Sequence, residues 1–242
     1  MIQFDSFKGK NIAISGASRG IGRETSKLLG SLGANLILGS RNEAELKEVA
    51  VQVEQAGGHA LPVHLDVTDE ISVRDFSDAA RREFGRVDTL INSAGTGRFS
   101  SVLDLSSEDF DQMISVNLKG TFLCCKYFGK QMVKQGFGHI LNIVSIAGVV
   151  ALPGGGGYSA SKFGILGLSR VLQTELRSQG VQVTSVLPGA VNSTFWADID
   201  PKPDLSSMIP LATLARHIVY LLSSHDGAFV DEMTIMPPLG IL

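Results

Sequence analysis

The sequence predicts an α/β protein with a doubly wound parallel sheet and helices on both of its faces. Apolar segments of strand length alternate with segments of helical periodicity from one end of the chain to the other. The strand candidates lack polar alternation, as in a parallel sheet that is covered on both faces. The 242 residues, 44% of them hydrophobic, carry no linker, repeat or low-complexity segment. We therefore expect a single domain spanning residues 1–242.

Each element follows from this alternation. Buried strands are predicted at Asn11–Ser15, Asn35–Ser40, Ala60–Leu65, Val87–Asn92, His139–Ser145, Val181–Leu187 and Glu232–Met236. Helices are predicted at Ile21–Leu32, Glu43–Ala56, Ile71–Phe84, Asp109–Lys134, Ser159–Ser178 and Leu211–Ser223. Strand–helix–strand units of this kind have right-handed crossovers. The least regular stretch, Ala190–Pro210, is expected to be a mobile lid with few buried contacts.

Composition and charge exclude several classes of function. The net charge is −3 and the basic residues are scattered, so we expect no nucleic-acid partner. The sequence contains no run of about 18 apolar residues, so we expect no membrane span. Met1–Lys10 has no apolar core of the kind found in a secretory signal, so none is expected. Cys124 and Cys125 are adjacent and form no disulfide framework, which favours a cytoplasmic location. The five histidines are scattered, so no metal site is expected.

A glycine-rich turn directly follows the first predicted strand. It runs from Ser15 to Gly22 with the sequence Ser-Gly-Ala-Ser-Arg-Gly-Ile-Gly. Glycines permit a tight turn and close approach of the backbone to a pyrophosphate, which then lies at the helix N-terminus. Ordinary turns between strand and helix also use glycine. The position after the first strand nevertheless favours a dinucleotide-binding Rossmann fold.

The end of the second strand indicates which dinucleotide is bound. NAD-binding Rossmann folds carry an acidic residue here, which holds the ribose 2′-hydroxyl. This sequence has Ser40 followed by Arg41, and a second arginine, Arg19, lies in the glycine loop. Either arginine alone could be a solvated surface charge. Two guanidinium groups with no carboxylate beside them suit a 2′-phosphate, so NADP(H) is the expected cofactor.

A tyrosine and a lysine lie four residues apart at the start of a predicted helix. This spacing places Tyr158 and Lys162 on one helix face. An isolated tyrosine titrates near 10, and a neighbouring cation favours its phenolate. Ser145, at the end of a strand, can hold a substrate oxygen while Tyr158 transfers the proton. The same spacing also occurs on ordinary half-buried helices, but here it is combined with the glycine loop.

These motifs together resemble the compact, single-domain class of short-chain dehydrogenases/reductases over nearly the whole chain. The matching segments are Gly16–Gly22, Asp66-Val67, Asn92–Gly95, Asn117, Ser145, Tyr158–Lys162 and Pro188-Gly189. The resemblance implies a catalytic tetrad of Asn117, Ser145, Tyr158 and Lys162. Tyr158 would be the general acid/base, and Lys162 would tune it and bind the nicotinamide ribose. Asn117 would hold a water that extends a proton relay.

The resemblance also implies which residues bind NADP(H). Asp66 and Val67 would flank the adenine, Asn92 would brace the sheet, and Val191 would meet the nicotinamide carboxamide. The full set is Gly16, Ser18, Arg19, Gly20, Ile21, Gly22, Ser40, Arg41, Asp66, Val67, Asn92, Ala94, Gly95, Tyr158, Lys162, Pro188, Gly189, Val191, Ser193 and Thr194. Ser15 and Ser93 replace the family's usual threonine and asparagine, and both keep a hydrogen-bonding side chain.

The expected function is hydride transfer between NADP(H) and a small carbonyl compound or alcohol. A non-catalytic NADP(H)-binding sensor or scaffold is a second hypothesis, which the intact tetrad disfavours. An acyl-carrier-linked 3-oxoacyl reductase is a third, although residues 135–139 and 178–180 lack the basic side chains typical of such members. The apolar tail Pro237–Leu242 and the two long helices Asp109–Lys134 and Ser159–Ser178 predict a homodimer or homotetramer.

Overall fold

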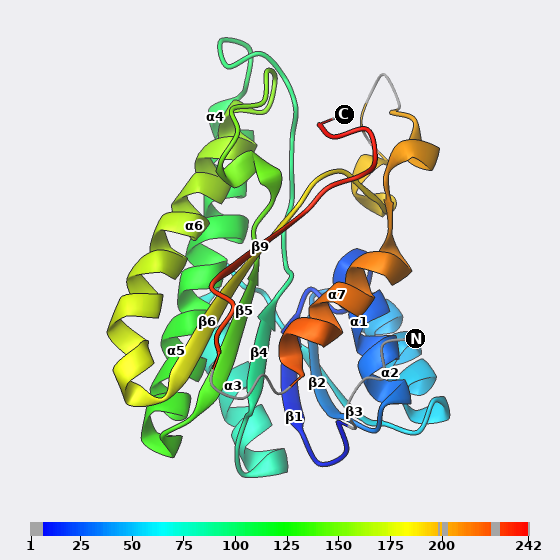
Figure 1. The fold of residues 1–242 in the computed structure, drawn as a ribbon, viewed down its shortest axis with the longest axis vertical. Helices are drawn as coiled ribbons and strands as arrows, with labels where there is room; N and C mark the ends of the chain where they lie inside the picture. Colours follow the sequence, from blue (N-terminus) through cyan, green and yellow to red (C-terminus); the bar gives the residue numbers. More distant parts are fainter. Residues whose placement is uncertain (1–6, 198, 200–202, 224–227, 242) are drawn as a thin grey trace.

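Seven parallel strands form the central sheet of the computed structural model, which describes residues 7–197, 199, 203–223 and 228–241 (Figure 1). Their spatial order is β3-β2-β1-β4-β5-β6-β9. The predicted doubly wound α/β fold is therefore confirmed. The strands are β1 (Asn11–Ser15), β2 (Asn35–Ser40), β3 (His59–His64), β4 (Thr89–Asn92), β5 (Gly138–Ile143), β6 (Val181–Pro188) and β9 (Glu232–Ile235).

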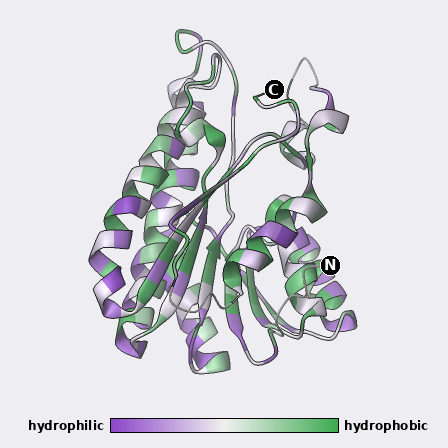
Figure 2. Ribbon diagram, viewed as in Figure 1, coloured by the Kyte–Doolittle hydropathy of each residue, from purple (hydrophilic) through white to green (hydrophobic). Residues whose placement is uncertain are grey.

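Helices cover both faces of this sheet. On one face lie α1 (Gly20–Ser31), α2 (Glu43–Gln55) and α7 (Leu211–Leu222), and on the other lie α3 (Glu70–Phe84), α5 (Gly120–Gln135) and α6 (Gly156–Leu176). Successive residues of β2 alternate between the two layers, since Leu36 and Leu38 pack in one core and Ile37 in the other. The strands are green along most of their length in Figure 2, as expected for a sheet that is buried on both faces.

One predicted helix differs from a regular α-helix. The stretch expected at Asp109–Lys134 consists of α4 (Ser107–Met113), a π-helical segment η1 (Ile114–Lys119) and α5. The wide turn carries Asn117, whose side chain is hydrogen-bonded to both main-chain groups of Thr96. Such π segments frequently occur at functional sites. The uniform helical period predicted from the sequence is therefore wrong at η1.

The irregular region before α7 is more ordered than the sequence indicates. Short strands β7 (Val191–Asn192) and β8 (Ile209–Pro210) pair in parallel at its two ends, and Val191, Met208 and Ile209 are buried. Between them lie two single-turn helices, η4 (Thr194–Trp196) and η5 (Leu205–Ser207). The expectation of few buried contacts is thus wrong for both ends. Residues 198 and 200–202, which include Pro201, lie outside the described residues.

The topology places a crevice over one edge of the sheet. Strand order reverses between β1 and β4, because β1 is followed by β2 on one side while β4 begins the other half. Doubly wound sheets bind ligands outside the carboxyl ends of the strands at such a switch point. No helix within the described residues is long and apolar enough to cross a membrane.

Candidate active site

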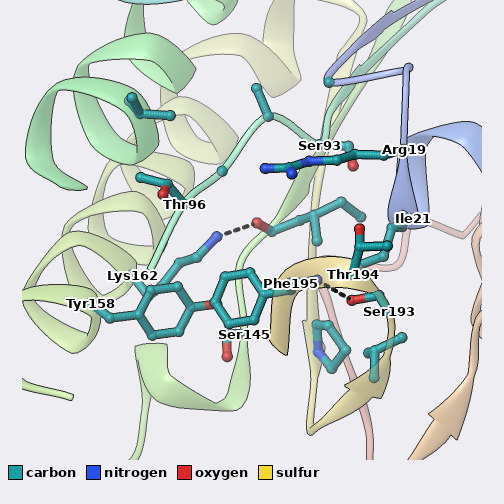
Figure 3. Close-up of a pocket in the computed structure, with 18 of the residues that line it drawn as sticks. Arg19, Ile21, Ser93, Thr96, Ser145, Tyr158, Lys162, Ser193, Thr194 and Phe195 are labelled. Carbon is teal, nitrogen blue, oxygen red and sulfur yellow. Dashed lines mark hydrogen bonds between the residues drawn. The ribbon is translucent and has the colours of Figure 1, made fainter. Parts of the chain in front are cut away.

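A continuous cavity lies over the carboxyl ends of β1, β4, β5 and β6 (Figure 3). It extends from the glycine loop at one end to the first turns of α6 at the other. The structure brings most of the predicted site residues to this one cavity. These are Gly16, Ser18, Arg19, Gly20, Ile21, Ser40, Arg41, Asp66, Val67, Ala94, Gly95, Ser145, Tyr158, Lys162, Pro188, Gly189, Val191, Ser193 and Thr194.

The glycine loop forms a tight turn against the end of β4. Gly16 has a φ of +69°, and a Cβ there would lie 2.7 Å from the backbone nitrogen of Ala94. A Cβ at Gly22 would clash with the carbonyl oxygen of Gly16. Both positions therefore require glycine for backbone packing. The helix that follows, α1, has no acidic side chain in its first turn, so the positive end of its dipole is available to an anion.

Two arginines flank this end of the cavity. Arg19 and Arg41 are exposed, and their side chains form no salt bridge or hydrogen bond with the described residues. Beside them, the hydroxyl of Ser40 donates to that of Ser18 at 2.9 Å. Burial raises the pKa of Asp66, but hydrogen bonds from Thr68 and the charge of Arg41 outweigh it and lower the pKa. Two guanidinium groups at this end of the cavity suit a dinucleotide that carries an additional phosphate.

The first turns of α6 place Tyr158 and Lys162 together. Lys162 is buried, and its Nζ donates to the carbonyl oxygen of Ile143 at 2.9 Å. The same Nζ lies 5.6 Å from the centroid of the Tyr158 ring. Ser145 lies two residues after the end of β5. Its side chain forms a hydrogen bond with the side chain of Tyr158. A serine, a tyrosine and a lysine therefore converge where β5 and α6 meet the cavity.

Burial shifts the pKa values of these two ionisable groups in opposite directions. Desolvation raises the pKa of Tyr158 to about 12, although the hydrogen bond with Ser145 lowers it in part. Desolvation also lowers the pKa of Lys162 to about 7. Near neutral pH the phenol therefore keeps its proton, whereas the amine exchanges its proton readily. This combination suits acid–base chemistry at the Tyr158 hydroxyl.

Three predicted site residues lie outside the cavity lining, namely Gly22, Asn92 and Asn117. The amide of Asn92 donates to Asn142 Oδ1 at 2.8 Å within the sheet. The amide of Asn117 donates to the Thr96 carbonyl at 2.8 Å and to Ser161 Oγ at 2.9 Å, while its Oδ1 accepts from the Thr96 nitrogen. Both amide hydrogens of Asn117 are thus used within the protein, and its role in holding a water stays a prediction.

Other lining residues had no signal in the sequence. Phe99 lies four residues after Gly95 in an irregular segment, and Ile241 comes from the tail at the end of the chain. Neither position belongs to a motif or a periodic pattern, so only the three-dimensional arrangement brings them to the site. The further lining residues that the sequence did not indicate are Leu65, Thr96, Gln112, Val116, Ile143, Val144, Ile146, Leu152 and Ala190.

The fold and the site are those of an oxidoreductase that uses a nicotinamide dinucleotide. The family model for short chain dehydrogenases matches residues 10–204, and the chain belongs to this family. It is 35% identical to a 3-oxoacyl-[acyl-carrier-protein] reductase of Synechocystis over 91% of this chain and 92% of that protein. It is 34% identical to an uncharacterised oxidoreductase of Staphylococcus epidermidis over 95% of this chain and 98% of that protein.

Solved structures show the same fold. An alcohol dehydrogenase from the archaeon Thermococcus sibiricus, complexed with 5-hydroxy-NADP, has a TM-score of 0.86 at 32% identity, covering 93% of this chain and 96% of that one. A metagenomic short-chain oxidoreductase in complex with NADP has a TM-score of 0.84 at 32% identity, covering 96% of this chain and 99% of that one.

Proposed function

We propose that the protein transfers a hydride between NADP(H) and a small carbonyl compound or alcohol, with Tyr158 as the general acid/base. The observation that carries this proposal is the shared cavity, which has Arg19 and Arg41 at one end and Ser145, Tyr158 and Lys162 at the other. Both solved relatives described above are complexed with NADP or a derivative of it, which supports the choice of cofactor. Cofactor and substrate sites would then share one domain, residues 1–242.

The side chains divide the work of the reduction. NADPH, when bound, supplies the hydride for the carbonyl carbon. Tyr158 donates its hydroxyl proton to the carbonyl oxygen, and Ser145 holds that oxygen with a hydrogen bond. Lys162 can exchange protons with Tyr158, because burial brings the pKa of its amine to about 7. The same side chain would hold the nicotinamide ribose. Asn117 keeps the Thr96 backbone and η1 in place beside Lys162.

Residues along the rest of the cavity would contact the other parts of NADP(H). Gly16–Gly22 would hold the pyrophosphate at the start of α1, and Asp66 and Val67 would flank the adenine. Val191 would contact the nicotinamide carboxamide, and Ser193 or Thr194 the pyrophosphate. The cavity lining supports these placements for every residue named here except Ala17 and Gly22. Gly22 packs against the backbone of Gly16.

A second candidate function is reduction of a 3-oxoacyl group on an acyl carrier. It is favoured by the names of two relatives, the Synechocystis reductase and a reductase of Thermotoga maritima that is 30% identical over 94% of this chain and 96% of that protein. A non-catalytic sensor or scaffold is the third candidate.

We further propose a cytoplasmic location and a homodimeric or homotetrameric assembly.

Steady-state kinetics distinguishes these candidates. The purified protein is mixed with NADPH or NADH and with a panel of ketones, aldehydes and a 3-oxoacyl-carrier thioester. Oxidation of NADPH by small carbonyls, with a higher kcat/KM than for the thioester, supports the proposal. Faster turnover of the thioester supports the carrier-linked function. Tight binding of NADPH without turnover of any substrate supports the sensor.

A further inference from the structure

Three aromatic rings gather around Tyr158 at the catalytic end of the cavity. Phe99 lies between the others, with its ring centroid 5.6 Å from that of Tyr158, 6.1 Å from that of Phe195 and 6.0 Å from that of Trp196. The rings of Tyr158 and Phe195 are 5.7 Å apart. Figure 3 shows Phe195 beside Tyr158. The surface next to the catalytic hydroxyl is therefore largely aromatic.

Phe99, Phe195 and Trp196 form an aromatic wall in which both ring faces and ring edges are presented. Phe99 and Trp196 are stacked, with 22° between their planes. Phe195 stands edge-on to both, at 85° to Phe99 and 82° to Trp196. A planar ring bound here can stack on one face and meet the edge of another ring, which are the two preferred geometries of aromatic pairs. A flexible acyl chain gains no such oriented contact and loses more rotamer freedom on binding.

Contacts within the protein hold these rings in place. The indole nitrogen of Trp196 donates to the carbonyl oxygen of Val191 at 2.8 Å. A Cβ at Gly97 would lie 2.5 Å from Cζ of Phe195, so Gly97 leaves room for that ring. Next to Phe99, the backbone nitrogen of Ser100 donates to the carbonyl oxygen of Gly154 at 2.8 Å. A wall that is ordered before binding costs the ligand less free energy.

The charges around the wall disfavour an anionic substrate. Lys162 is the only charged side chain at this end of the lining within the described residues, and it already donates to the Ile143 carbonyl. Phe99 and Gln112 both line the cavity. The chain between them carries four acidic side chains and no basic one. Arg98, just before it, lies 3.7 Å from an oxygen of Asp109. The acids are Asp104, Glu108, Asp109 and Asp111. An acidic carrier protein that docked against this segment would be repelled by it.

We propose that Phe99, Phe195 and Trp196 select uncharged carbonyl compounds that bear a planar ring next to the carbonyl group, and disfavour linear acyl chains on carriers. This inference rests on the proposed function, since it assigns the substrate class of the same site. Stacking holds the ring against the wall while the carbonyl oxygen lies at Ser145 and Tyr158. The three rings act by binding and orienting the substrate, and the proton transfer belongs to Tyr158.

The test compares two methyl ketones with eight carbons each, acetophenone and 2-octanone. Their kcat/KM values with NADPH are measured for the wild type, Phe99→Leu, Phe195→Leu and the control Phe137→Leu, which alters an aromatic ring outside the cavity. Intrinsic reactivity cancels when the ratio of the two ketones is compared between variants. We expect the acetophenone/2-octanone ratio to fall roughly three- to tenfold in Phe99→Leu and Phe195→Leu. It should stay at the wild-type value in Phe137→Leu.

Binding gives a second measurement that does not require turnover. Trp196 is the only tryptophan in the sequence, so quenching of its emission reports a ligand at this wall. With NADP⁺ present and N-acetyltryptophanamide correcting for light absorption, acetophenone should bind more tightly than 2-octanone, and Phe99→Leu should weaken that preference. Equal affinity of the two ketones, or a ratio unchanged in both wall variants, overturns the inference. Selective binding without turnover supports the inference and instead contradicts the proposed function.

Discussion

At the scale of single residues, the chemistry of the site depends on how burial affects two groups on one turn of α6. Burial raises the pKa of Tyr158 to about 12 and lowers that of Lys162 to about 7, because each charged form loses its hydration. The sequence predicts that these side chains share a helix face, but spacing carries no information on burial. From the sequence we expected the neighbouring lysine to favour the phenolate. In the structure, desolvation dominates the pKa of Tyr158, and the effect that opposes it is the hydrogen bond with Ser145.

Tyr158→Phe tests the proton donor. The substitution removes the transferable proton and nearly preserves the shape of the side chain. We expect kcat for carbonyl reduction to fall by about 10²–10⁴-fold, the usual contribution of general acid–base catalysis, and the Kd of NADPH to remain near the wild-type value. Tyr127→Phe, outside the cavity, is the matched control. Retention of most activity in Tyr158→Phe would show that another group donates the proton.

Lys162→Met tests the cost of burying the amine. In the unfolded chain the lysine pKa is near 10.5, and in the folded protein it is about 7. Below pH 7 both states are protonated and the fold carries the full cost of the buried charge. Between pH 7 and about 10 the folded protein has released the proton, so its stability rises with pH by up to about 1.4 kcal/mol per unit.

Urea unfolding at several pH values measures this dependence. Lys162→Met lacks the titrating group, so its free energy of unfolding should exceed that of the wild type most at pH 7 and below. The difference should shrink as the pH rises toward 10. Curves for the two proteins that run parallel across this range would show that Lys162 keeps an ordinary pKa in the fold.

Arg41→Ala tests cofactor selection. A charge-assisted contact with the 2′-phosphate is worth about 1.5–3 kcal/mol, which corresponds to roughly ten- to a hundredfold in Kd. We expect NADPH to bind that much more weakly to the variant and NADH to bind unchanged. Arg23→Ala, on α1 and outside the cavity lining, should leave both affinities as they are. Tighter binding of NADH than of NADPH by the wild type would contradict the assignment.

At the scale of elements, the sequence is informative where a residue pattern has one structural solution. The first two strands, Asn11–Ser15 and Asn35–Ser40, coincide with β1 and β2 because they are uninterrupted apolar runs between turn residues. The π-helical segment η1 has no such pattern, and its Asn117 is bonded to a backbone segment 21 residues away. Two-residue strands such as β7 and β8 have no periodicity either, so their pairing cannot be predicted from the sequence.

The segment between β7 and β8 remains a candidate lid. Its ends are buried, while Asp204, Leu205 and Ser206 are exposed and bonded mainly to one another. Amides of the described residues 204–207 should exchange rapidly in the free protein and more slowly with NADPH and substrate bound. Hydrogen exchange followed by mass spectrometry measures this difference. Equal protection in both states would show that the segment does not close over the site.

At the scale of the whole molecule, the topology explains why the site could be predicted while its specificity could not. The strand order brings the glycine loop after β1 and the serine after β5 to the same edge of the sheet, so short motifs far apart in sequence meet. The aromatic wall comes from the connections that follow β4 and β6, where the fold imposes no residue type. Phe99 and Ile241 are therefore invisible to a motif-based interpretation.

The outer surface of α5 and α6 carries exposed apolar side chains that support the predicted assembly. Leu123, Cys124, Cys125 and Leu166 face the protein's own core rather than a partner. The large apolar side chains that remain exposed on these helices are Phe122 on α5 and Phe163 and Val171 on α6, with exposed fractions of 44%, 47% and 52%. In the tail, Leu239 is 74% exposed. Apolar residues gathered on a long helix pair are typical of a two-fold interface.

Sedimentation equilibrium at micromolar concentration tests this assembly. We expect the wild type to sediment as a dimer or tetramer of the 25.7 kDa chain. Phe163→Asp should weaken the helix-paired dimer, because a carboxylate cannot be buried there without a partner charge. Deleting Leu239–Leu242, of which Leu242 lies outside the described residues, should reduce a tetramer to that dimer. The deletion also removes Ile241, which lines the cavity, so it changes the active site as well as the tail. Leu239→Asp is the matched variant that alters the tail and leaves the cavity lining intact. A wild type that sediments as a clean monomer would refute the assembly.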